Sequence, residues 1–175
     1  MKKLLLPLAV ILLFPLIYSC DELTNPSFDI DTDLGYEYSF YITEQDASTI
    51  NDEFIVFIND QDVLDNLSNI EEWKVDKVTY QVTVYDGAPD IVLNGTLIFG
   101  SIDVSVSNLN LLNAYTSGTE ATLPVSDQDL VNLANEIKAN AATSGIIGSI
   151  TGNVSGKPVW FSVYVKMYLT ARVKP

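Results

Sequence analysis

The chain has 175 residues, with 9 basic and 23 acidic side chains and a formal net charge of −14 at pH 7. Such an acidic surface repels nucleic acids and anionic lipid headgroups, because both carry negative charge. The sequence contains no histidine, which excludes Ser-His and Cys-His nucleophile pairs and removes the commonest transition-metal ligand. We therefore expect no nucleic-acid partner, no enzymatic activity of these kinds and no transition-metal cofactor.

The first 19 residues have the organisation of a secretory signal peptide. Lys2 and Lys3 form a basic start, and the apolar run 4–17 follows, interrupted by Pro7 and Pro15. A helix that spans a bilayer needs about 20 apolar residues, and this run is shorter and contains two helix-breaking residues. The pattern predicts a cleaved signal peptide over residues 1–19 rather than a membrane-spanning anchor.

Cys20, the only cysteine, follows the end of this run by three positions. The stretch "LIYSC", with Ile17 three positions before the cysteine and Ser19 next to it, resembles the lipobox of bacterial lipoproteins, although Tyr18 departs from the usual pattern. The resemblance implies cleavage before Cys20 and attachment of fatty acyl chains such as palmitate, with no other cofactor. Each buried methylene contributes about 0.8 kcal/mol, so two or three chains make a stable anchor. The alternative is a free thiol, which would leave a reactive group unpaired in an exported protein.

Two acidic residues, Asp21 and Glu22, come directly after the cysteine. In lipoproteins of the Bacteroidota type, acids at this position resemble a signal for export to the outer face of the outer membrane. In enterobacterial lipoproteins an aspartate there would instead indicate retention in the inner membrane. A merely solvated tether is the third interpretation. The first interpretation implies a lipid-anchored protein on the outer membrane that faces the cell exterior.

Residues 20–34 have the composition of a tether, and residues 35–175 are predicted to form a single domain. Removal of residues 1–19 would leave 156 residues and a net charge of −16, because Lys2 and Lys3 would be lost. That length suits one domain, which can bury a substantial core without disulfides.

Three aspartates in the tether, Asp29, Asp31 and Asp33, alternate in the manner of a calcium loop. An EF-hand loop that began at Asp29 would have Leu34 and Phe40 where Gly and Glu are required, so that motif fails. On an extended strand the three carboxylates lie about 6.6 Å apart, too far to chelate one ion unless the chain bends. They are weak candidates for a metal site, and a solvated tether is the favoured interpretation.

Alternation of apolar residues predicts a mainly β protein with about seven strands. The predicted strands are 36–42, 53–59, 77–87, 91–100, 102–108, 145–156 and 159–173. The turn "DGAPD" between the third and fourth strands predicts that these two form a hairpin. Apolar residues at helical spacing predict two helices, 62–73 and 126–141, with Asp60 or Asp62 and Ser126 as their N-caps. Together these elements predict an antiparallel β-sandwich with two connecting helices.

The order of the elements adds to the lipoprotein resemblance. A tether, paired strands, the stretch "VTYQVTVYDG", a late helix and a long final strand are similar to small Bacteroidota lipoproteins, many of which have no assigned function. This likeness covers most of the mature chain, but it rests on apolar alternation rather than on chemically specific residues.

The final strand, 159–173, carries the most informative surface. Its odd positions are all apolar and are predicted to face the core. The opposite face then carries Trp160, Tyr164 and Tyr168 in steps of about 13 Å, together with Lys166 and Arg172. Such an aromatic ladder could stack sugar rings or contact a protein partner. The alternatives are that a helix covers it or that the aromatic rings only stabilise neighbouring strands.

Two other stretches match catalytic motifs only superficially. The stretch "GNVSGKP" (152–158) has three residues between its glycines where a phosphate-binding loop needs four, and Pro158 follows its lysine. Glu71 and Glu72 are adjacent, and no second carboxylate can be placed opposite them as a glycosidase requires. We therefore expect a non-catalytic lipoprotein that acts as an accessory or structural subunit beside an outer-membrane protein. The alternative is a surface lipoprotein that binds a glycan or other ligand through the aromatic face.

Overall fold

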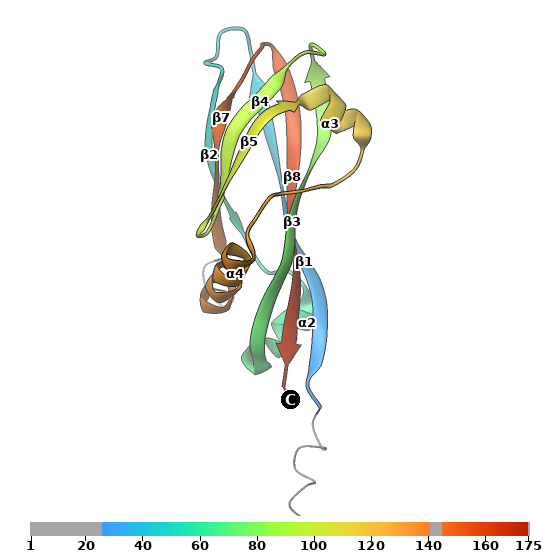
Figure 1. The fold of residues 1–175 in the computed structure, drawn as a ribbon, viewed down its shortest axis with the longest axis vertical. Helices are drawn as coiled ribbons and strands as arrows, with labels where there is room; N and C mark the ends of the chain where they lie inside the picture. The colour runs from blue at the N-terminus through green and yellow to red at the C-terminus, as the bar shows by residue number, and fades with distance from the viewer. Residues whose placement is uncertain (1–25, 141–144, 175) are drawn as a thin grey trace, which may run out of the picture.

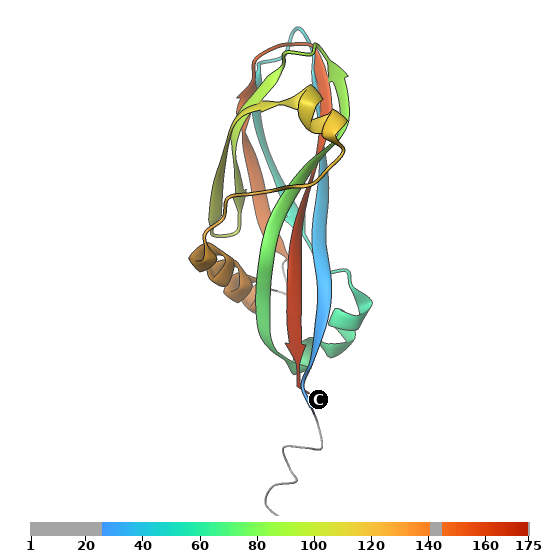
Figure 2. The same cartoon turned by 45° about the vertical axis from the view of Figure 1, so that its right-hand side comes forward.

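The computed structural model describes residues 26–140 and 145–174, which form two four-stranded antiparallel sheets packed face to face (Figures 1 and 2). In chain order the elements are β1 (Phe28–Ile42), β2 (Thr49–Val56), α2 (Gln61–Asn66), the 3-10 turn Leu67–Asn69, β3 (Ile70–Gly87), β4 (Val92–Phe99), β5 (Ile102–Asn110), α3 (Leu111–Ser117), β6 (Ala121–Thr122), α4 (Asp127–Asn140), β7 (Ile146–Val154) and β8 (Val159–Val173). The predicted class, an antiparallel β-sandwich, is confirmed.

The two sheets differ in length. The long sheet has the order β1-β8-β3-β6, and the short sheet has the order β2-β7-β4-β5. In the long sheet, β1 and β8 pair over 15 residues each, from Phe28 opposite Val173 to Ile42 opposite Val159. The chain therefore enters the fold and leaves it at the same end of the molecule (Figure 1).

The core lies between the sheets and is dominated by the central strand β8. All eight odd positions of this strand, from Val159 to Val173, are buried, as their alternation predicts. Phe161 is fully buried and stacks on Phe40 of β1 with 4.9 Å between ring centroids. Phe54 of β2 stacks on Tyr36 of β1 at 4.9 Å, which joins the two sheets.

Helix α4 closes the part of the long sheet that extends beyond the short one (Figures 1 and 2). The helix predicted after Ser126 is present, and Leu133, Ala134 and Ile137 form its buried stripe. The hydroxyl of Ser126 accepts the N–H of Asp129 at 3.2 Å as an N-cap. No helix in the described residues is long and apolar enough to span a bilayer.

The predicted helix 62–73 is shorter in the structure. Asp60 caps α2 by accepting the N–H groups of Asp62 and Val63, but the helix ends at Asn66. From Ile70 the chain belongs to β3, because β8 offers it pairing partners as far as Val173, with bulges at three places. Long-range pairing thus overrides the helical spacing of a short segment.

The predicted hairpin of strands 77–87 and 91–100 is wrong. β3 pairs with β8 and β6 in the long sheet, whereas β4 pairs with β5 and β7 in the short sheet. The turn between them therefore carries the chain from one sheet to the other, and Ile91 is buried there. The sequence pattern also missed α3 and the two-residue strand β6.

Residues 28–34, expected as tether, form the first half of β1. Leu34 is buried there, and Asp29, Asp31 and Asp33 face outward opposite polar residues of β8. An acidic residue at every second position is compatible with a strand whose outer face meets solvent. Cys20 and the expected signal peptide lie outside the described residues.

Candidate functional site

The outer face of the long sheet carries the five residues singled out on β8, and none of the five is fully buried. Trp160 is 44% exposed and lies opposite Tyr41, which is 74% exposed, at the end of the sheet farthest from Phe28. Tyr164 and Tyr168 are only partly exposed. The three aromatic side chains therefore do not form one uniform open ladder.

Tyr164 lies over Gly35 of the neighbouring strand. A Cβ atom at Gly35 would meet the Tyr164 hydroxyl at 2.0 Å and the adjoining ring carbon at 2.4 Å. The ring thus occupies the space that a side chain on β1 would fill, an arrangement in which an aromatic residue covers a glycine in a sheet. This contact explains why Tyr164 is partly buried.

Lys166 lies at the centre of a polar cluster. Its ammonium group is 3.2 Å from the Asp33 carboxylate and 3.4 Å from the Glu120 carboxylate. Glu120 also accepts hydrogen bonds from the Tyr168 hydroxyl at 2.7 Å and from the buried Thr79 hydroxyl at 3.1 Å. Glu120, which precedes β6, thus ties the edge of the sheet to its centre, and sequence spacing did not reveal it.

The electrostatics of this cluster favour its charged form. The hydrogen bond to Asp33, followed by the charge of that carboxylate, raises the pKa of Lys166 above its ordinary value. The hydrogen bond from Tyr168 lowers the pKa of Glu120, and the same bond raises the pKa of Tyr168. A lysine whose pKa is raised is a poor general base, so the cluster is suited to holding strands together rather than to proton transfer.

Replacement of Lys166 by methionine should destabilise the protein by about 1.5 kcal/mol at pH 7, because two carboxylates lose a charge-assisted hydrogen bond at a partly buried site. The measurement is urea unfolding, with Lys174→Met, which removes an exposed lysine that pairs with one carboxylate away from this cluster, as the control. Folding lowers the pKa of Glu120. The stability that its carboxylate contributes is therefore fully present above the pKa of Glu120 in the unfolded chain, and it is lost as the pH falls through the pKa in the folded protein. The difference between variant and wild type should therefore shrink below about pH 4. Equal stabilities of the two at pH 7 would contradict the structural role.

The three aspartates considered as metal ligands have separate partners. Asp29 forms an ion pair with Arg172 at 3.0 Å, Asp31 accepts the Thr170 hydroxyl at 3.1 Å, and Asp33 belongs to the Lys166 cluster. Within residues 26–140 and 145–174, no group of three or more acidic or thiol side chains is placed to hold a metal ion. β1 stays extended, so the carboxylates do not converge.

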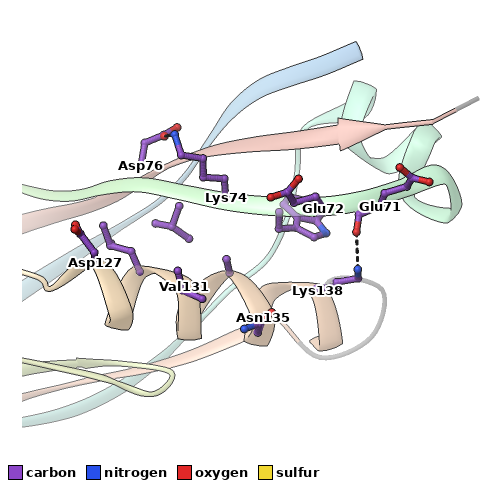
Figure 3. Close-up of a pocket in the computed structure, with 12 residues that line it drawn as sticks. Glu71, Glu72, Lys74, Asp76, Asp127, Val131, Asn135 and Lys138 are labelled. Atoms are coloured by element: carbon purple, nitrogen blue, oxygen red, sulfur yellow. Dashed lines mark hydrogen bonds and ion pairs between the residues drawn. The ribbon is translucent and has the colours of Figure 1, made fainter. Parts of the chain in front are cut away.

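A groove between β3 and α4 was not predicted from the sequence (Figure 3). It has a volume of about 530 Å³. Its lining comes from two segments, Glu71 to Asp76 of β3 and Asp127, Leu130, Val131, Ala134, Asn135 and Lys138 of α4. At one end, the Lys138 ammonium donates to the backbone oxygen of Glu71 at 2.5 Å. In the sequence, the signal for this groove is Val131, an apolar residue that lies outside the buried stripe of α4. In the structure its side chain is 54% exposed.

The fold and these surfaces define an antiparallel β-sandwich with a closed polar network on one face and an open groove at one edge. No protein-family model matches the sequence, and no curated protein matches it. Among solved structures, the decameric BFDV capsid protein has a TM-score of 0.40 and 12% identity, with 83% of this chain and 99% of that chain covered. The structure of Desmodium yellow mottle tymovirus has a TM-score of 0.38 and 7% identity, with 86% of this chain and 84% of that chain covered. The structure of Mud crab tombus-like virus has a TM-score of 0.37 and 8% identity, with 93% of this chain and 98% of that chain covered. Likenesses this low carry no argument about function.

Proposed function

We propose that this protein is a non-catalytic lipoprotein of the outer membrane, facing the cell exterior, that acts as an accessory or structural subunit of an envelope complex. In this proposal a lipid on Cys20 is the anchor, and no other cofactor takes part. The "LIYSC" stretch and the acids after it support the anchor and its location. The role as a subunit rests on the arrangement of the folded domain.

The observation that carries the proposal is the position of β1. The strand begins at Phe28, paired with Val173, so both ends of the described chain lie at one end of the sandwich. Seven residues separate Cys20 from Phe28, which at about 3.3 Å per residue spans at most about 26 Å. β1 then runs from Phe28 for about 43 Å, at about 3.3 Å per residue, to the exposed Tyr41 and its neighbour Trp160. A lipid on Cys20 would hold this end near a membrane and present the other end to partners.

The polar network on the long sheet supports a subunit role over glycan binding at that face. The Tyr168 hydroxyl is bonded to Glu120, and the Tyr164 ring covers Gly35. A sugar platform needs exposed ring faces, and two of the three aromatic residues are engaged within the protein. Glycan binding would therefore depend mainly on Trp160 and Tyr41.

The test is purification of the tagged full-length protein from native membranes in mild detergent, with mass spectrometry of its N-terminal peptide and of the proteins that accompany it. We expect an acylated Cys20 and a stoichiometric outer-membrane protein. The Cys20→Ser variant should lose the acyl mass and at least about 90% of its membrane-bound fraction, because its only covalent lipid site is removed. Ser19→Ala is the control and should keep both.

An unmodified Cys20 in membrane-bound wild type would contradict the anchor. A lipidated protein that purifies alone would contradict the role as a subunit. Glycan binding would then be tested by a screen for glycans that bind the wild type but not the Trp160→Ala variant.

A further inference from the structure

One edge of the long sheet is open along the groove. β3 pairs with β8 on one side, but on its other side β6 meets only Thr79 and Tyr80. Over residues 70–78 no described strand lies beside this edge. Because alternate peptide groups of a strand point to opposite sides, about half of the peptide groups in this stretch point away from β8. This stretch is about 26 Å long at 3.3 Å per residue. It is an unpaired strand edge of the kind that accepts another strand.

The two ends of this open edge are closed by the protein itself. The N–H of Leu123 donates to the Val78 oxygen at 2.9 Å, and Lys138 donates to the Glu71 oxygen at 2.5 Å. Between them, from Trp73 to Asp76, no loop or side chain of the described residues bonds to the backbone. The open stretch therefore has defined limits, and Figure 3 shows the one at Lys138 and Glu71. The β3 residues that line the groove lie between these limits.

Helix α4 forms an apolar wall beside this edge. Val131 is 54% exposed, and Leu130 and Ala134 line the groove with it. A strand added to β3 would place every second side chain on the face that α4 borders and the others on the solvent side. Its inward side chains would contact apolar groups, so apolar residues are favoured at alternate positions.

Charge favours basic residues at the other positions. Of the four acids in the lining, Glu71, Glu72 and Asp76 already form ion pairs with Lys174, Arg172 and Lys74, whereas the whole chain carries a net charge of −14. A second copy of the chain would carry the same strong negative charge, which opposes association. Basic residues on an incoming segment would be attracted instead.

We propose that the open edge of β3 binds an extended segment of a partner protein, with alternating basic and apolar residues, as an added strand. The inference rests on the proposed role as an accessory subunit and names the mode of contact with its partner. Backbone hydrogen bonds supply affinity in this mode, and alternate side chains supply specificity. The bulge between Val75 and Lys77 and the exposed Lys74 limit indiscriminate pairing at the same edge.

The test uses the purified full-length protein in detergent and a fluorescent octapeptide of alternating lysine and valine. Two derivatives carry N-methyl groups, one on the valine amides and the other on the lysine amides. The derivatives have the same charge, but only one directs its methylated amides at β3. We expect one derivative to keep the affinity of the parent and the other to lose at least about tenfold in Kd, which corresponds to about 1.4 kcal/mol.

A matched pair of variants locates the site. Val131→Lys places a positive charge and a longer side chain in the groove, whereas Asn132→Lys places the same charge on an exposed part of α4 outside the lining. The first should weaken binding about tenfold, and the second should change it less than about twofold.

Equal binding of the two methylated peptides would overturn the proposal, since charge alone would then explain capture. Equal effects of the two lysine variants would do the same. A dimer that Val131→Lys dissociates would assign the groove to a second copy and also overturn it. Because the assay does not depend on the lipid, an unmodified Cys20 would count against the proposed anchor and leave this result unaffected.

Discussion

Replacement of Phe161 by alanine should lower the free energy of unfolding by about 4 kcal/mol, the largest loss that we expect from one core side chain. Phe161 is fully buried on the central strand of the long sheet and stacks on Phe40. The truncation removes the apolar surface of a phenyl ring and leaves a cavity that two paired neighbouring strands cannot easily fill. The measurement is urea unfolding followed by tryptophan fluorescence.

The adjacent residue supplies the control for this prediction. Trp160→Ala removes a larger side chain from the same strand, but Trp160 is 44% exposed on the outer face. Its loss should cost less than about 1 kcal/mol, because surface substitutions leave no cavity. Equal costs for the two variants would contradict the assignment of odd positions to the core. If the alanine variant does not fold, Phe161→Leu should still cost about 1.5 kcal/mol.

Replacement of Gly152 by alanine should cost about 3 kcal/mol, because a single methyl group would collide with backbone atoms of the neighbouring strand. A Cβ atom there would lie 2.4 Å from the Asn94 oxygen and 2.8 Å from the Gly95 Cα. Gly152 pairs directly with Gly95, whose own Cβ would meet the Thr151 oxygen at 2.5 Å. The backbone cannot rotate away as a side chain can, so β4 and β7 would have to separate.

Asn153→Ala is the matched control, since Asn153 is the exposed next residue on β7. It should change the free energy of unfolding by less than about 0.5 kcal/mol. Thermal unfolding of both variants measures the difference. A Gly152→Ala protein as stable as the control would show that β4 and β7 tolerate a wider separation than the structure has.

Close packing between strands also accounts for glycines in and beside the stretch 152–158, which matched a phosphate-binding loop only superficially. A Cβ at Gly148 would meet the Phe54 ring at 2.3 Å, and one at Gly152 would meet backbone. Both positions are therefore glycine for reasons of packing between strands.

For the aromatic residues of β8, alternation in the sequence predicts the face on which each side chain lies but not its exposure. Alternation correctly placed Trp160, Tyr164 and Tyr168 on one face of β8, because the direction of a side chain from a strand is a local property. Their different exposures depend on Gly35, which β1 brings beside Tyr164, and on Glu120, which the segment before β6 brings to Tyr168. Both contacts join residues far apart in the sequence, so spacing within β8 contains no information about them.

Around Ile70, local spacing predicts where a helix begins but not where it ends. Val63 and Leu67 have helical spacing, and the helix begins where Asp60 predicts, yet it ends at Asn66. What ends it is the length of β8, which provides partners for β3 from Gly87 back to Ile70. The groove follows from the same event, because β3 extends past β6 and leaves its edge to α4.

Local sequence patterns predict the β class, the core face of the last strand and the helix after Ser126, and the structure confirms these three; the lipid on Cys20 stays a prediction. Each depends on side chains near one another along the chain, where period and capping act directly. Three other features appear only in the folded chain: β3 and β4 belong to different sheets, Lys166 joins Asp33 to Glu120, and the edge of β3 stays open. These features arise from pairing between distant segments, whose energy depends on partners that no local pattern identifies.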